Sequence, residues 1–201
     1  MSLTTSNDEH EPNTDLQSIL VHLFEDSEVI RRNLVPQLLT ARENISASDV
    51  RNVLDESMNI IRGWSPELQA IFIAGHPRIG ETRNLSVLSS SEQSAGTSAG
   101  TPTSPEVLQR LQHLNMCYEH VYPGLRYISF VNGRTRAAIA EEMEDKLGIA
   151  RSLSPDQPQI ESLAPIAANS PQWLAELGRA LEDVGFIAKS RLEKLEQKES
   201  E

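Results

Sequence analysis

The chain has 201 residues and a formal net charge of −11, with 18 Lys and Arg against 29 Asp and Glu. This acidic balance argues against a nucleic-acid partner or an anionic membrane surface, because both require cations that neutralise phosphate. No apolar run approaches the ~20 residues that span a bilayer. The single cysteine, Cys117, excludes an internal disulfide and a zinc site built from cysteines. The length predicts one domain.

Both ends of the chain are polar. Residues 1–13 are acidic and lack apolar periodicity, which predicts a disordered tail rather than a targeting leader. Residues 196–201 are predicted to form a second polar tail, and they do not end in the peroxisomal Ser-Lys-Leu signal. We therefore expect a cytoplasmic protein, with the peroxisome as the alternative compartment, and a folded domain over residues 14–195.

Apolar residues at helical spacing predict three helices in the first part of this domain. The first begins at Thr14, and the second is capped by Ser27. Pro36 lies within the second pattern and predicts a kink or a break there. The third helix covers residues 50–61 and ends near Gly63.

Serine–proline pairs mark the next two helix starts, because serine caps a helix and proline fits its first position. Ser65-Pro66 begins a helix that should end before Pro77, since proline disfavours helical geometry in the residue that precedes it. Ser104-Pro105 begins a long helix that Pro123-Gly124 terminates.

The last part of the domain alternates helices with irregular chain. Residues 127–131 have strand character but no evident partner strand, so we predict an extended loop. A helix over 136–147 is closed by Gly148, and a Pro-, Ser- and Ala-rich loop insertion follows over 149–170. The final helix is predicted over 171–195. The sequence therefore predicts an all-α, single-domain bundle of roughly six to eight helices.

Two short motifs carry residues suited to chemistry. Gly75-His76-Pro77 holds a histidine between a helix end and a proline, and imidazole is the side chain whose ordinary pKa lies near neutrality. His76 is thus a candidate acid or base; the alternative is a ring that only caps its helix. Ser89-x-x-Glu92-Gln93 offers a hydroxyl, a carboxylate and an amide at a predicted helix start, where it either binds a ligand or serves as a capping box.

Other polar groups point less clearly to a site. Arg126, Arg134 and Arg136 either bind a carboxylate or phosphate or form ion pairs with the acidic helices. The five histidines are scattered along the sequence, so we expect no metal site. Cys117 is interpreted as a small buried hydrophobe, because no basic neighbour is evident that would lower its pKa.

Several motifs, taken in order, resemble those of the 2-oxo-4-hydroxy-4-carboxy-5-ureidoimidazoline (OHCU) decarboxylase family. The resemblance covers residues 16–192 and rests on Phe24-Glu25-Asp26-Ser27, Ala74-Gly75-His76-Pro77, Ser89-x-x-Glu92-Gln93, Leu114-Asn115-x-x-Tyr118 and the final helix with Glu176, Ile187-Ala188 and Arg191-Leu192. It implies an all-α bundle that decarboxylates OHCU to (S)-allantoin in urate degradation. It also implies no metal or organic cofactor, a small ureido-imidazoline substrate and a homodimer.

The resemblance also implies roles for individual residues. His76 is the acid or base at the reacting carbon, and Glu92 orients it or the substrate hydroxyl. Ser89 and Gln93 hydrogen-bond the ureido and ring groups, with Pro77 beside them.

Two departures from the family pattern affect the expected substrate contacts. The segment with Tyr127 and Ile128, expected to supply an aromatic wall and a backbone donor, is one residue longer than the family pattern. Lys146 stands where we expect the family's substrate-binding arginine, and Arg151, Arg126 or Arg136 are the possible substitutes.

Three functions therefore remain open at this point. The first is the OHCU decarboxylase, with His76 and Glu92 as its central pair. The second is a non-catalytic binding or structural protein of the same fold, which predicts that Glu92 is used for capping and that Lys146 points to solvent. The third is a decarboxylase-like enzyme that keeps the site and acts on a different substrate.

Overall fold

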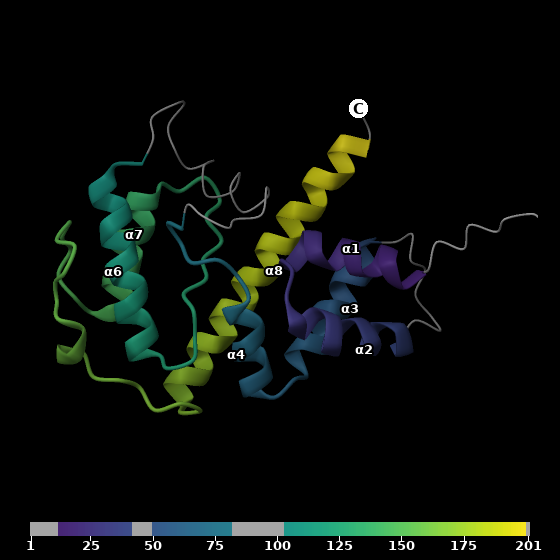
Figure 1. Ribbon diagram of the computed structural model, residues 1–201, viewed down its shortest axis with the longest axis horizontal. Helices are drawn as coiled ribbons and strands as arrows, with labels where there is room; N and C mark the ends of the chain where they lie inside the picture. Colours follow the sequence, from purple (N-terminus) through teal and green to yellow (C-terminus); the bar gives the residue numbers. More distant parts are fainter. Residues whose placement is uncertain (1–11, 42–49, 82–102, 200–201) are drawn as a thin grey trace, which may run out of the picture.

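A computed structural model describes residues 12–41, 50–81 and 103–199 (Figure 1). Within these ranges the chain forms seven α-helices and no strand, so the predicted all-α fold is confirmed. The helices are α1 (Pro12–Phe24), α2 (Val35–Ala41), α3 (Val50–Arg62), α4 (Pro66–Ala74), α6 (Pro105–Val121), α7 (Arg136–Leu147) and α8 (Pro171–Glu199). No helix in the described ranges is both long and apolar enough to cross a membrane.

The helix ends follow the capping signals of the sequence. Ser65 and Ser104 accept hydrogen bonds from the backbone N–H groups three residues on, and each is followed by proline at the first helical position. Thr135 caps α7 in the same way. Gly148 ends α7 with φ 66°, a left-handed conformation that glycine adopts without steric cost.

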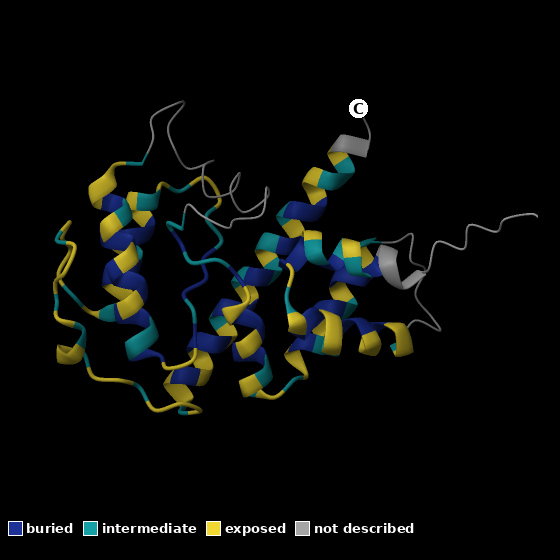
Figure 2. Ribbon diagram, in the orientation of Figure 1, coloured by how far each residue is buried: buried dark blue, intermediate teal, exposed yellow. Residues whose placement is uncertain are grey.

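Helix α8 is the central element of the fold. It crosses the molecule diagonally in Figure 1 and packs against α1, α3 and α4, while α6 and α7 pair with each other. Figure 2 shows buried residues along the inward faces of these helices. Leu177, Ala180, Val184 and Ala188 recur at helical spacing along α8 and are buried. One helix therefore contributes both to the core and, further along, to a cavity.

Three boundaries differ from the sequence prediction. The sequence predicts a kink or a break at Pro36, and the helical path does not break there: a π-helical stretch, Ile30–Leu34, ends just before α2, which begins at Val35 and includes Pro36. Helix α1 begins at Pro12, so residues 12 and 13 are helical, while the rest of the predicted N-terminal tail lies outside the described residues. Helix α8 continues to Glu199, beyond the predicted end at 195.

The long connection between α7 and α8 is irregular except for a short 3₁₀ helix, Ile160–Ser162. A buried arginine of α6, Arg110, holds this connection through hydrogen bonds to its backbone. Arg110 pairs with Glu144 of α7 and donates to the carbonyl oxygens of Ser154 (2.9 Å) and Gln157. We call these interactions of Arg110 the Arg110 clasp; they hold the connection at the end of the molecule away from α1.

Candidate functional site

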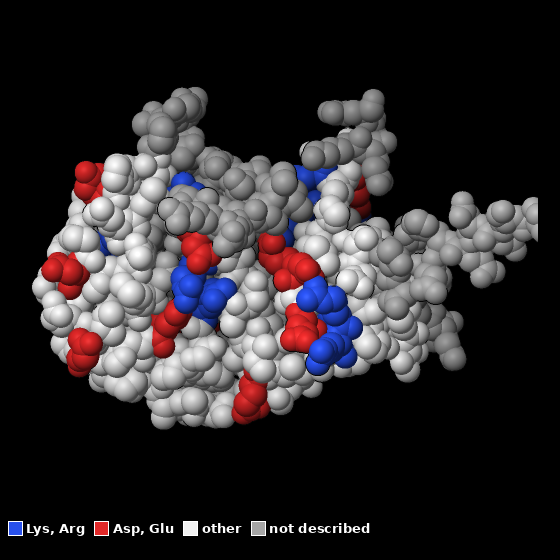
Figure 3. All heavy atoms as spheres, in the orientation of Figure 1, with Lys and Arg blue, Asp and Glu red and all other residues white. Residues whose placement is uncertain are grey.

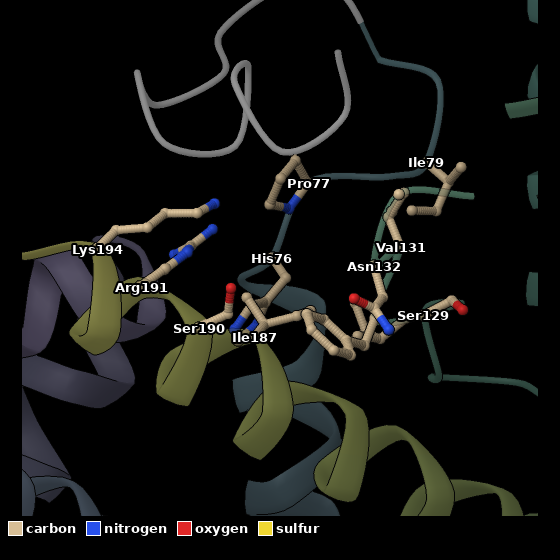
Figure 4. A pocket seen from close by; sticks show the side chains of 13 residues that line it. His76, Pro77, Ile79, Ser129, Val131, Asn132, Ile187, Ser190, Arg191 and Lys194 are labelled. Carbon is tan, nitrogen blue, oxygen red and sulfur yellow. The ribbon is translucent and has the colours of Figure 1, made fainter. Parts of the chain in front are cut away.

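A cavity of about 250 Å³ lies between three elements of the fold (Figure 4). The end of α4 contributes His76 and Pro77, and the extended segment 128–133 forms the facing wall. The third wall is α8. The volume suits a small heterocyclic molecule rather than a polymer or an extended cofactor.

The α8 wall changes from apolar to cationic along the helix. Ile187, Ser190, Arg191 and Lys194 line the cavity. Their spacing of three, one and three residues places them on one helical face. In Figure 4 the nitrogen ends of Arg191 and Lys194 both extend toward Pro77. The cavity is thus polarised, with positive charge at one end.

His76 is held tightly at the cavity wall. Its side chain is buried, Nδ1 lies 3.2 Å from the carbonyl oxygen of Phe72, and the Phe72 ring packs edge-on at 5.1 Å. The backbone carbonyl of His76 accepts a hydrogen bond from Arg126. Nε2 is buried and has no hydrogen-bond partner among the described residues. A buried polar atom left without a partner beside a cavity is a candidate for ligand contact.

Burial lowers the pKa of His76 from 6.5 to about 4; the charge of Arg191 lowers it further and that of Glu25 opposes the shift. The ring is therefore neutral at pH 7. A carbonyl oxygen can only accept, so the contact with Phe72 places the single ring proton on Nδ1. Nε2 then carries a lone pair and can act as a base.

Arg191 is an almost fully buried cation, with 2% of its surface exposed. It donates to Glu25 Oε1 at 2.7 Å and to the carbonyl oxygen of Leu23 at 3.3 Å. Glu25 follows the last residue of α1 and has φ 69°. The ion pair thus ties the end of α1 to α8 and fixes the guanidinium beside the cavity.

Lys194 differs from Arg191 in its surroundings. It is exposed, and within the part of the chain that the structure describes it forms no ion pair. Figure 3 shows other cationic side chains lying next to acidic ones on the face in view. Among the ion pairs of the described residues, Arg78 pairs with Glu119 at 2.7 Å and Arg32 with Glu28 at 2.7 Å.

The extended wall is positioned by a buried polar network behind it. Arg179 donates to the carbonyl oxygen of Ile128 at 2.9 Å and to Glu176, which also accepts from Tyr118 and Lys146. The Arg179 guanidinium lies 5.2 Å from the centre of the Tyr127 ring. The network therefore fixes the path of the wall, whose residues Ile128 and Asn132 face the cavity.

The structure brings together only some of the residues predicted as site residues. His76, Pro77 and Ile128 line the cavity. Ser89, Glu92 and Gln93 lie outside the described residues.

The other predicted substrate contacts lie elsewhere. Tyr127 is buried and donates to Glu142 at 2.7 Å, and it is not among the cavity residues. Lys146 pairs with Glu176, and the exposed Arg151 pairs with Asp145 and Glu141. Both cations are paired with acidic side chains away from the cavity lining, in contrast to Lys194.

The three arginines noted in the sequence also have partners. Arg134 pairs with Glu142, Arg126 donates to the backbone of His76, and Arg136 donates to Thr103 at 3.2 Å. Cys117 is buried near His113, and burial raises its thiol pKa. No cluster of three or more metal-binding side chains occurs in the described ranges.

Sequence reasoning did not identify Arg191, Lys194 and Glu25 as site residues. The signal was present in the spacing 187, 190, 191 and 194, which places two cations and a serine on the same helical face as Ile187. Arg191 lines the cavity and is followed by Leu192 in the core, which is the Arg–Leu order that we expected at Lys146-Leu147.

Comparisons with known proteins place the chain in a family. Searches of curated proteins and of solved structures gave no match. The family model described as OHCU decarboxylase matches residues 9–167, which include the end of α4 and the extended wall but not α8. Because the match covers most of the chain, this protein belongs to the OHCU decarboxylase family.

Proposed function

We propose that this protein decarboxylates 2-oxo-4-hydroxy-4-carboxy-5-ureidoimidazoline to (S)-allantoin, using side chains alone. Membership of the family implies a decarboxylase of urate degradation that acts on a small molecule. The observation that carries the finer proposal is the free Nε2 of His76, buried beside a cavity that Arg191 also lines.

The reaction needs a base and then an acid at neighbouring atoms. When the bond to the carboxylate breaks, its electron pair forms a double bond to the adjacent ring carbon, and the electrons of the ring C=N bond move to nitrogen, which takes up a proton from solvent. The enol that results loses its hydroxyl proton and becomes a ring carbonyl. The adjacent carbon gains a proton on one face, and this sets the configuration of allantoin.

His76 suits both proton transfers. Its neutral ring offers the Nε2 lone pair to the substrate hydroxyl, and the protonated ring then holds a proton that it returns to the adjacent carbon. Protonation is costly in this buried position, so the imidazolium is a strong acid and gives the proton up readily. The hydrogen bond to Phe72 keeps the ring in one orientation.

Arg191 stabilises the electron density that the ring gains as carbon dioxide leaves. Its guanidinium is fixed by Glu25 and by backbone carbonyls, so no reorganisation is required during the reaction. The apolar side chains of Ile79, Ile128 and Ile187 line the cavity and exclude water from the reacting ring carbons. Glu92, by family resemblance, orients the hydroxyl.

The test generates the unstable substrate in place, from urate with uricase and hydroxyisourate hydrolase, and follows (S)-allantoin by circular dichroism. The wild-type protein is expected to give a rapid enantiopure product. H76N keeps a donor near Phe72 and H76Q places an amide near the position of Nε2, yet neither transfers protons, so both should lose at least ~10²-fold in kcat.

The matched control for these variants is H22Q, which removes an exposed imidazole on α1 and should leave kcat unchanged. Only slow, racemic product from the wild-type protein would contradict the proposal and favour the binding or altered-substrate functions. Full activity in H76N and H76Q would contradict the role of His76 even if the substrate were correct.

A further inference from the structure

The two cations of the α8 wall lie in different environments. Arg191 is buried and already engaged with Glu25, whereas Lys194 is exposed and forms no ion pair within the described ranges. Lys194 lies one helical turn beyond Arg191, on the same face and at the solvent end of the cavity wall. Figure 4 shows its side chain extending along the same side of the cavity as Arg191.

An anionic ligand must approach a protein whose net charge is −11. Long-range repulsion from such a surface lowers the association rate of an anion, and a local unpaired cation at an opening offsets the repulsion. A lysine ammonium on a flexible stem suits this role, because it can follow the ligand from solvent into the cavity. The neighbouring Ser190 hydroxyl also lines this wall and can donate to the same anion.

We propose that Lys194 is the group that captures and binds the carboxylate of the substrate at the cavity opening. The inference rests on the proposed function for the identity of the substrate, while its core claim is a carboxylate subsite at Lys194. Arg191, deeper in the wall, then faces the ring rather than the carboxylate. This division assigns binding of the ground-state substrate to Lys194 and stabilisation of the developing charge to Arg191.

These different roles predict that loss of Lys194 changes KM and leaves kcat nearly unchanged. A contact with the carboxylate exists in the bound substrate and weakens as neutral carbon dioxide forms, so its loss impairs binding without raising the barrier from the bound state. An exposed, solvent-screened pair is worth about 0.2–1 kcal/mol. K194Q should therefore raise KM by about 1.4- to fivefold, leave kcat within about twofold and flatten the salt dependence of kcat/KM. K194R should restore the wild-type values.

The matched control is K189Q. Lys189 is an exposed lysine on the same helix and is absent from the cavity lining, so K189Q changes the net charge as K194Q does without touching the site. An equal effect of the two variants on KM, or a fall in kcat with KM unchanged in K194Q, would overturn the inference.

A binding measurement separates this inference from the proposed function. Hydantoin-5-acetate and hydantoin share a five-membered ureide ring and differ by a carboxylate-bearing arm, and their affinities are measured by calorimetry. The wild-type protein and K189Q should prefer the carboxylate probe, and K194Q should lose about 1.4- to fivefold of that preference. If this pattern appears while OHCU is not decarboxylated, the carboxylate subsite stands and the proposed function fails. No preference in the wild-type protein, or an unchanged preference in K194Q, would overturn the subsite.

Discussion

The buried imidazole of His76 makes the stability of the fold depend on pH. Its pKa is lowered to about 4 in the folded protein, mainly by burial and further by Arg191, against 6.5 as the ordinary value. Between these two pH values the unfolded chain binds one more proton at this residue than the folded chain does. The free energy of unfolding therefore falls as pH falls through this window.

The magnitude follows from the two pKa values. The interval from 6.5 to about 4, at about 1.4 kcal/mol for each pH unit, corresponds to a loss of roughly 3 kcal/mol. The stability is fully present above about pH 6.5 and is lost progressively until about pH 4. For a single domain of marginal stability, this loss is a large fraction of the total.

Urea unfolding of the wild-type protein and H76N, followed by circular dichroism at a series of pH values, measures the effect. Carboxylates that titrate at the acidic end contribute to both proteins, so the difference between the two curves isolates His76. This difference should change by roughly 3 kcal/mol across the window, in the direction that favours H76N at low pH. Parallel curves, or an imidazole resonance of His76 that titrates near 6.5 by NMR, would refute the reasoning.

Three further predictions concern the Arg110 clasp, a helix end and the extended wall. R110M leaves Glu144 buried without its cation, so the free energy of unfolding should fall by about 3–5 kcal/mol in urea unfolding, and protease should cut the connection between α7 and α8 more readily. If R110M resists protease as well as the wild-type protein does, Arg110 does not hold this connection in place. G148A places a Cβ at φ 66° and should cost about 1 kcal/mol by the same unfolding assay, whereas no loss would mean that the turn relaxes. R179M removes the donor to the Ile128 carbonyl and should lower kcat/KM about tenfold in the allantoin assay, with an unchanged pH profile because His76 is not touched; full activity would show that the wall holds its path unaided.

Local signals in the sequence predicted most of the fold. Ser65-Pro66, Ser104-Pro105 and Gly148 mark helix ends through their own backbone chemistry, and the structure has helix boundaries at each of them. Pro36 lies next to a change from π- to α-helix at Leu34 and Val35, a detail that a single proline in the sequence does not reveal. Local chemistry therefore predicts where helices begin and end better than how a helix accommodates a disruption.

The candidate site was less accessible to the same reasoning. His76 was found because its motif is local, and the structure places it at the cavity. Lys146 was chosen by its distance along the chain from the extended segment, but the helix on which it lies turns it toward Glu176. Arg191 comes from an element more than a hundred residues after His76, and only packing of α4 against α8 brings the two together.

The arrangement of the α8 wall offers a way around a conflict inherent in decarboxylation. A cation that binds a carboxylate tightly stabilises the charge that must disappear, and so it slows the reaction that it helps to begin. In the mechanism that we propose, the exposed Lys194 at the opening makes a weak contact with the carboxylate. The buried Arg191 lies beside His76, where the substrate ring would gain electrons. The double variant R191K/K194R exchanges the two residues and keeps the net charge. It should reduce kcat far more than it changes KM, because the interaction of the buried, preorganised guanidinium is the one that we expect to strengthen in the transition state.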